Sequence, residues 1–236
     1  MLPAWFSDSG LNENDAYTTD DIFRFLEDGS GVNQSRDKLS IAVGRIPAVS
    51  IAEAKAAVDK IAYYSSRLPK GNWKNNLLIL ADDQDNAIHL EQAEDAIAAM
   101  ASNPEGNGRL YEKLYLDSYP LSFSSTGAAY PQARKRMLDR INDGVAYVNY
   151  IGHANPREWG HEKLLTWTDI ENLSNRRLPF IYAATCEFLR WDDDDISGGE
   201  KLWLKPESGV IGMICPSRKV YISVSYTHLT LPTKSR

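Results

Sequence analysis

Two residues that could form a catalytic pair follow two successive apolar runs. His153 comes two residues after the run 145–151, and Cys186 directly follows the run 179–185. Runs of about seven apolar residues suit strands buried on both faces, and the turn-and-helix stretch 168–175 between them is typical of a parallel β-α-β unit. Because neighbouring parallel strands end at one edge of a sheet, the imidazole and the thiol are predicted to face each other there. That is the arrangement of a Cys–His nucleophile pair.

The chemistry of such a pair assigns further roles. Cys186 is predicted to be the nucleophile and His153 its base, with the backbone N–H groups of Ala154 and Cys186 as oxyanion donors. A third group should orient the imidazole, and Asp83, which follows the apolar run 76–81, is the first candidate, with Asp82 second. The alternative is that the cysteine is a small buried hydrophobe and the histidine is structural.

Other residues are weaker candidates for a site. Trp159 and Trp191 flank the two catalytic segments and either wall a substrate pocket or pack in the core. His89 follows the polar stretch 82–86, which is predicted to cap a helix rather than to bind a cation, since it lacks the turn glycine of a calcium loop. No CxxC or Cys/His cluster indicates zinc. The sequence predicts no metal ligands and no required cofactor; structural calcium is left open as an alternative but is not indicated.

The elements that must position these residues alternate along the chain. Ser50 and Glu53 form a capping box that begins one helix, with apolar residues at Ala54, Val58, Ile61 and Leu68. The predicted strands are 39–44, 76–81, 112–116, 145–151, 179–185 and 209–214, and further predicted helices are 88–101, 128–142, 168–175 and 198–204. This alternation predicts an α/β fold with a mostly parallel sheet covered on both faces.

The overall composition is that of an ordinary globular protein. The 236 residues are 43% hydrophobic and 25% charged, with a net charge of −6. The negative charge and the lack of a Lys/Arg cluster argue against nucleic acid as a partner. No apolar run reaches the length of about 18 residues that a transmembrane helix needs, and the first residues lack the pattern of a signal peptide.

The chain is predicted to divide into three parts. Residues 1–38 are expected to be a partial N-terminal region, and residues 39–221 the catalytic domain. Residues 222–236 resemble translated sequencing-adapter read-through and are expected to be a non-native tail. Since the α/β pattern starts abruptly, we expect the chain to be a fragment whose N-terminus lacks one or more β-α units.

Several separated motifs, in order, resemble those of one peptidase family. They are Ala42-Val43-Gly44-Arg45-Ile46-Pro47, Val148-Asn149-Tyr150-Ile151-Gly152-His153 and Ala184-Thr185-Cys186-Glu187-Phe188, together with Asp20-Asp21 and Phe25-Leu26-Glu27-Asp28. The chain is similar to the gingipain family of clan CD cysteine peptidases over most of residues 16–221. Within that family it most resembles the PorU-type sortases of the type IX secretion system.

The resemblance implies a caspase-like three-layer fold with His153 and Cys186 as the catalytic dyad, and it places the family's acidic orienter at Asp83. It also implies an enzyme that removes C-terminal sorting domains from exported polypeptide cargo through a thioester and joins the cargo to surface lipopolysaccharide. Its expected partners are the cargo and other secretion components. Its expected location is the outer membrane, the cell surface or the extracellular space, with no transmembrane segment in this stretch.

Two features depart from the family pattern and leave alternatives open. Ala154 stands where glycine usually follows the histidine, so the oxyanion site requires a backbone that avoids positive φ at this residue. The specificity carboxylate is not recognisable, because Asn86 occupies the nearest position. One alternative is a secreted protease that only hydrolyses its substrates. The other is a catalytically inactive caspase-like module that binds a partner.

Overall fold

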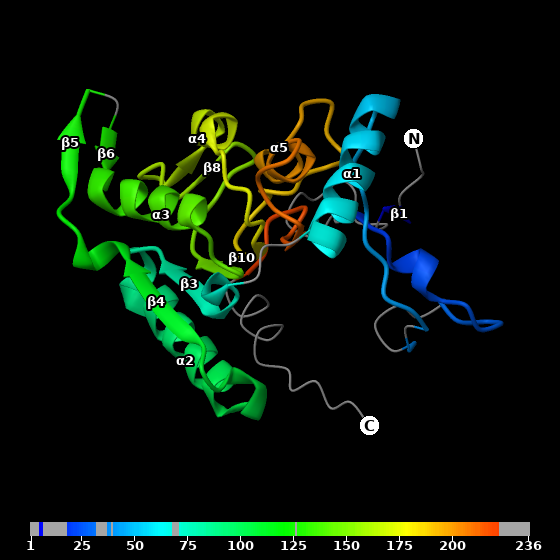
Figure 1. The fold of residues 1–236 in the computed structure, drawn as a ribbon, viewed down its shortest axis with the longest axis horizontal. Coiled ribbons are helices and arrows are strands. Elements are labelled where there is room, and N and C mark those ends of the chain that lie inside the picture. The colour runs from blue at the N-terminus through cyan, green and yellow to red at the C-terminus, as the bar shows by residue number, and fades with distance from the viewer. Residues whose placement is uncertain are drawn as a thin grey trace.

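A five-stranded sheet forms the centre of the protein (Figure 1). The structure is a computed structural model that describes residues 5–6, 18–31, 37–38, 40–67, 71–125 and 127–221. The strand order is β11-β10-β7-β3-β4, and every neighbouring pair is parallel. The strands are β3 (Asn76–Ala81), β4 (Leu110–Tyr115), β7 (Tyr147–Ile151), β10 (Phe180–Ala184) and β11 (Gly212–Ile214).

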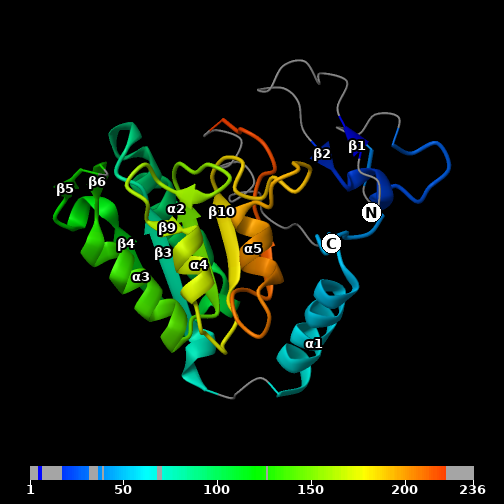
Figure 2. The same ribbon diagram turned by 90° about the horizontal axis from the view of Figure 1, so that it is seen from above.

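Helices cover both faces of this sheet, which confirms the predicted α/β fold (Figures 1 and 2). α2 (Ile88–Ser102) lies on one face, and α3 (Pro131–Asp143), α4 (Trp167–Asn172) and α5 (Gly198–Leu204) lie on the other. The chain passes from β3 to β4 on one side and then returns past β3 to β7 on the other. The strand order therefore reverses at β3, and ligands of open α/β sheets bind beside such a point, beyond the carboxyl ends of the strands.

The core follows from the alternation of side chains along the strands. Leu78 and Leu80 of β3 point to the face with α3, while Leu77 and Ile79 point to the face with α2. Apolar residues on both sets of positions are what a doubly covered parallel strand requires. The run Asn76–Ala81 is therefore a strand with the bounds that the sequence predicts.

The predicted first strand, residues 39–44, is not a strand in the structure. Leu39 lies outside the described residues, and residues 40–44 are irregular. Ile41 and Val43 are exposed, and the carbonyl of Ile41 accepts a hydrogen bond from Arg24 Nε at 3.1 Å. A short apolar run becomes a strand only where a neighbouring strand pairs with its backbone, and no described strand lies beside this one.

Helix α1 (Ile51–Arg67) begins at the predicted capping box. Ser50 Oγ accepts a hydrogen bond from Glu53 N at 3.2 Å, and Glu53 Oε2 accepts one from Ser50 N at 3.1 Å. The predicted apolar face is wrong, however, because Val58 and Ile61 are exposed and the helix buries Lys60 instead. Lys60 Nζ donates hydrogen bonds to the carbonyls of Trp203 and Val210, so a polar contact attaches α1 to α5.

The remaining strands form two-stranded antiparallel pairs. They are β1 (Trp5–Phe6) with β2 (Thr18–Thr19), β5 (Ser122–Ser124) with β6 (Gly127–Ala129), and β8 (Glu158–Trp159) with β9 (Leu165–Thr166). Short 3-10 helices lie at Asp21–Arg24, Asn72–Asn75, Asp85–Ala87, Pro104–Gly106 and Leu116–Ser118. Among the described helices, none has the length and apolar character to cross a bilayer.

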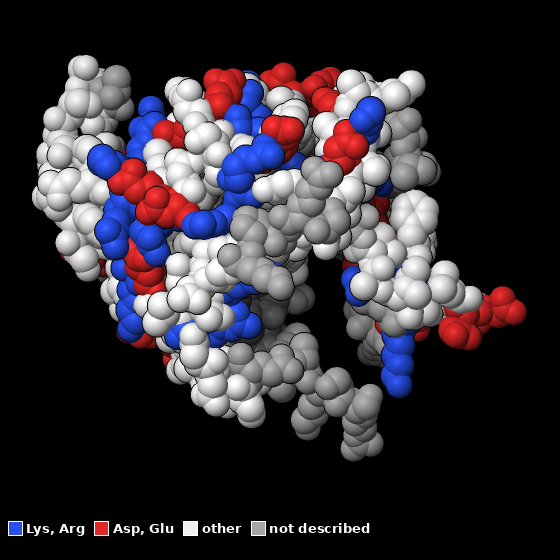
Figure 3. Space-filling view, viewed as in Figure 1, with Lys and Arg blue, Asp and Glu red and all other residues white. Residues whose placement is uncertain are grey.

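Charged side chains on the α3 side of the molecule occur as pairs. In Figure 3, blue and red atoms are interspersed over this side. Arg136 and Arg140 both contact the carboxylate of Glu112, and Lys135 pairs with Asp139 one turn along α3. The mixed signs leave no continuous basic stripe on the face that Figure 3 shows.

Candidate active site

Three neighbouring strands end at the same edge of the sheet and deliver the predicted site residues. Asp82 follows β3, His153 follows β7 after Gly152, and Cys186 follows β10 after Thr185. The backbone pairing continues past the strands, since Gly152 N donates to the carbonyl of Ala184 at 3.2 Å. His153 and Cys186 consequently line one small pocket of about 50 Å³.

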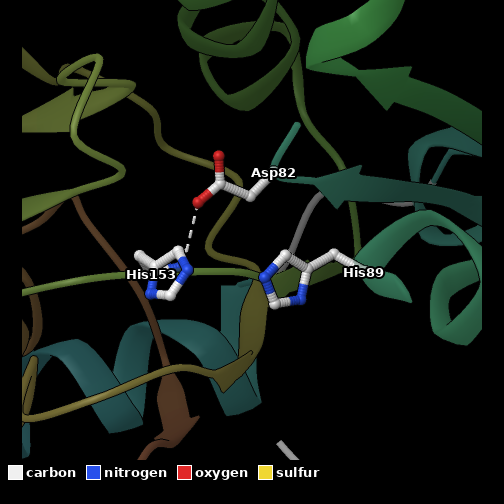
Figure 4. A group of neighbouring side chains, drawn as sticks. All are labelled: Asp82, His89 and His153. Atoms are coloured by element: carbon white, nitrogen blue, oxygen red, sulfur yellow. Dashed lines mark hydrogen bonds between the residues drawn. The ribbon is translucent and has the colours of Figure 1, made fainter. Parts of the chain in front are cut away.

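The backbone of His153 is held by two side chains. Its N–H donates to Asp82 Oδ2 at 3.0 Å, the dashed line in Figure 4, and its carbonyl accepts from the hydroxyl of Tyr150 at 2.7 Å. Burial raises the pKa of Asp82 to about 6, partly offset by the backbone N–H groups of His153 and Asp83. Asp82 therefore positions the main chain at His153 rather than its ring.

The carboxylate at the imidazole of His153 belongs to Asp85, which the sequence analysis did not select. Oδ2 of Asp85 lies 2.9 Å from Nε2 of His153. Asp83, the predicted orienter, instead accepts a hydrogen bond from the hydroxyl of Tyr130 at 2.6 Å. Burial and this contact raise the pKa of Tyr130 well above its usual range. Asp83 thus contacts the residue that precedes α3 and not the histidine ring.

The turn between β3 and α2 explains the difference. Asp85, Asn86 and Ala87 all adopt positive φ, at 59°, 56° and 66°. Three consecutive residues in the left-handed region turn the chain back toward the carboxyl edge of the sheet. The side chain of Asp85 therefore lies beside His153. Asp and Asn tolerate this conformation better than most residues, and the Asp85-Asn86 pair was the one signal of the turn in the sequence. The predicted capping by residues 82–86 is wrong, because Ala87 is the N-cap of α2 and no side chain caps it.

A second histidine faces the same carboxylate. His89 Nε2 lies 3.2 Å from Asp85 Oδ2, and its ring centroid lies 5.4 Å from that of His153. Figure 4 shows the two imidazoles and Asp82 around a common point. Burial lowers the pKa of His89, and the neighbouring His153 lowers it further, so the ring is neutral at neutral pH. The carboxylate of Asp85 therefore lies between two imidazole rings.

Cys186 is half-buried beneath a later segment of the chain. Its Sγ donates to the carbonyl of Val220 at 3.7 Å, and Glu187 N donates to the carbonyl of Arg218 at 3.3 Å. Ala154 does not adopt a positive φ. Among the described residues, none accepts a backbone hydrogen bond from the N–H of Ala154 or of Cys186.

The two tryptophans have different environments. Trp159 is fully buried and stacks on Tyr150 with ring centroids 4.4 Å apart, so it belongs to the core and does not line the pocket. The substrate-binding role predicted for it is therefore wrong: β8 directs its side chain inward. Trp191 lines a separate cleft of about 790 Å³, with the guanidinium of Arg45 4.3 Å from its ring. That cleft shares no lining residue with the Cys186 pocket.

The sequence matches the model of a known peptidase family. A family model described as peptidase family C25 matches residues 1–233. The chain belongs to family C25. The similar curated proteins are gingipain R2 of Porphyromonas gingivalis strain ATCC 33277 and gingipain R1 of Porphyromonas gingivalis, each 25% identical over 153 residues. These alignments cover 62% of this chain, but only 19% of gingipain R2 and 14% of gingipain R1.

Solved structures of gingipain R share the fold. The crystal structure of the Arg-specific cysteine proteinase gingipain R aligns with a TM-score of 0.70 at 18% identity, over 90% of this chain and 47% of that one. The complex of the RgpB pro- and mature domains aligns with a TM-score of 0.65 at 18% identity, over 81% and 44%. The fold is therefore caspase-like, as predicted, and the chain spans less than half the length of these relatives.

Proposed function

We propose that this member of family C25 is an active cysteine peptidase with Cys186 as nucleophile and His153 as general base. The observation that carries the proposal is that both residues follow adjacent parallel strands and line one pocket. The contact between His153 Nε2 and Asp85 supports it, because an oriented base is the third part of such a site.

The geometry supports a defined sequence of proton transfers. Because Nε2 of His153 contacts Asp85, Nδ1 is the nitrogen that takes the thiol proton. The thiolate attacks the scissile carbonyl carbon, and the N–H groups of Ala154 and Cys186 donate to the resulting oxyanion. The imidazolium then gives its proton to the leaving amine as the C–N bond breaks, which leaves a thioester on Cys186. Asp85 stabilises the imidazolium between these steps.

The second half of the reaction decides between hydrolysis and transfer. Water or an amine attacks the thioester carbonyl, His153 accepts the proton of the attacking group, and the thiol is restored. These steps require no cofactor. The resemblance of the sequence motifs to those of PorU-type sortases favours transfer as the physiological outcome. On this proposal the substrate is the C-terminal sorting domain of exported polypeptide cargo, processed at the cell surface together with other secretion components.

The first experiment is covalent labelling by an electrophilic peptide probe, read by intact mass. The parent should be labelled at Cys186, and His153→Ala should slow labelling by about 10²-fold or more, the usual contribution of a general base. Cys215→Ser is the matched control, because burial raises the pKa of the Cys215 thiol well above its usual value and so disfavours the reactive thiolate.

Circular dichroism of each variant establishes that the proteins compared are folded. Equal, slow labelling of folded parent and His153→Ala would refute the proposal and favour a binding module. Adding a peptide amine during turnover separates the two outcomes of the thioester: a joined product shows transfer, and release of the free acid alone shows hydrolysis.

A further inference from the structure

His89 is a buried polar residue that the proposed reaction does not use. Its side chain is 4% exposed, and neither ring nitrogen makes a hydrogen bond to any described residue. Nε2 lies near Asp85 but lacks the alignment of a hydrogen bond. Buried polar groups in proteins are nearly always satisfied, so a buried imidazole that makes no hydrogen bond and faces a second imidazole points to a ligand between them.

The groups around His89 have the composition of a transition-metal site. One ligand atom each of Asp82, His89 and His153 lies within 4.8 Å of the other two. Oδ2 of Asp85 is 2.9 Å from Nε2 of His153 and 3.2 Å from Nε2 of His89. Bonds of about 2.0–2.1 Å place two ligands of a tetrahedral zinc ion about 3.3 Å apart, and the carboxylate oxygen of Asp85 already has nearly that spacing to each imidazole nitrogen.

The donor set selects the class of cation. Two imidazoles with carboxylate oxygens suit Zn²⁺ and its neighbours among the divalent transition metals, whereas Ca²⁺ and Mg²⁺ prefer sites made of oxygen alone. Asp85 belongs to an exposed turn, so its carboxylate can move to meet an ion. Asp82 and His89 are buried, so their side chains are held in fixed positions. The sequence shows only part of this set, because Asp82, Asp85 and His89 lie close together after β3 whereas His153 follows β7, far along the chain.

We propose that His89, His153 and Asp85, supported by Asp82, bind Zn²⁺ and that the bound ion inhibits the peptidase. A zinc ion at Nε2 of His153 replaces the contact of this nitrogen with Asp85 and fixes the ring as a metal ligand. The imidazolium formed during proton transfer would then face a divalent cation, which raises the energy of that step. The inhibitory part rests on the proposed function, and the metal-binding part does not.

Isothermal calorimetry with Zn²⁺ alone tests the binding part without reference to activity. The full chain carrying Cys186→Ala should bind one ion, and adding His89→Gln should weaken binding at least about tenfold, as loss of a direct ligand requires. His161→Gln is the matched control, since His161 is exposed and its ring lies 5.3 Å from that of His153. His153→Gln, at a half-exposed position, provides a second ligand variant whose folding does not depend on a buried residue.

Inhibition is measured as the rate of Cys186 labelling with and without Zn²⁺, each variant against its own metal-free rate. Zinc should slow the parent and His161→Gln, Ca²⁺ should slow neither, and His89→Gln should be resistant. Undiminished zinc affinity in both His89→Gln and His153→Gln, or equal loss in His161→Gln, would overturn the proposed site. Normal binding without slower labelling would overturn its inhibitory role and leave the peptidase proposal standing.

Discussion

Nε2 of His153 and Oδ2 of Asp85 lie 2.9 Å apart, although the two residues come from different strand ends. Asp85 precedes α2 in a turn of three left-handed residues, and His153 follows β7. The contact holds the imidazole in one orientation and leaves its other nitrogen for the thiol. If His153 acts as the proposed base, the acid that orients it comes from a turn of positive φ and not from the residue that ends the strand.

Asp85→Asn should lower the rate of Cys186 labelling by roughly 10²-fold, since a triad acid sets the tautomer and charge of its histidine. Asp83→Asn is the matched variant two residues earlier, and its carboxylate contacts Tyr130 instead. A much smaller loss is expected there. The measurement is the initial rate of Cys186 labelling in the two folded variants. A larger loss of rate in Asp83→Asn than in Asp85→Asn would show that Asp83 orients the histidine.

Gly152→Ala should destabilise the protein by about 2 kcal/mol or more, because an added methyl group overpacks a rigid site. A Cβ at this position would lie 2.4 Å from the Cβ of Asp82 and 2.8 Å from the hydroxyl of Tyr150, the two groups that hold the His153 backbone. Gly44→Ala, where a Cβ meets nothing within 4 Å, is the control. Urea unfolding measures both, and equal midpoints would contradict the steric argument.

Lys60 should make stability rise with pH in the alkaline range. Burial, with a smaller effect of Lys205, lowers the pKa of Lys60 from 10.5 to about 8. Between these values the unfolded chain keeps a proton that the folded chain has released, so the free energy of unfolding increases as pH rises. At about 1.4 kcal/mol per pKa unit, the gain is roughly 3 kcal/mol.

Lys60→Met should remove this gain, and the exposed Lys55→Met on the same helix should not. The test measures the free energy of unfolding of the three proteins from pH 8 to 10.5. Subtracting the curve of each variant from that of the parent removes the contribution of the titrating groups that all three proteins share. Parallel curves for parent and Lys60→Met would show that the ammonium group is solvated in the folded protein.

Trp159→Ala should cost about 3–5 kcal/mol of stability, the usual loss for a buried aromatic residue. Its ring stacks on Tyr150 and lies 5.4 Å from the ring of Phe188, so truncation opens a cavity beneath β7 and β10. Trp191→Ala, at the rim of the larger cleft, should cost less. A stable Trp159→Ala protein with weaker peptide binding would restore the substrate role to this residue.

The elements built on local patterns were predictable from the sequence. β3, α2 and α5 have nearly the predicted bounds, because buried strands and amphipathic helices follow short-range periodicity in the sequence. The shared edge that carries His153 and Cys186 followed from the same logic, since parallel strands joined by helices end on one side. The run 39–44 failed because pairing with a neighbour, and not apolar character, makes a strand.

Tertiary structure decided which groups meet at that edge. Asp82, Asp83 and Asp85 are chemically alike and nearly adjacent, yet the first holds a backbone, the second contacts Tyr130, and the third contacts two imidazoles. The role of each carboxylate depends on the direction in which the turn between β3 and α2 points its side chain. It also depends on which residues near β7 and α3 lie beside that turn. Such directions arise from contacts between distant segments, so no local pattern in the sequence encodes them.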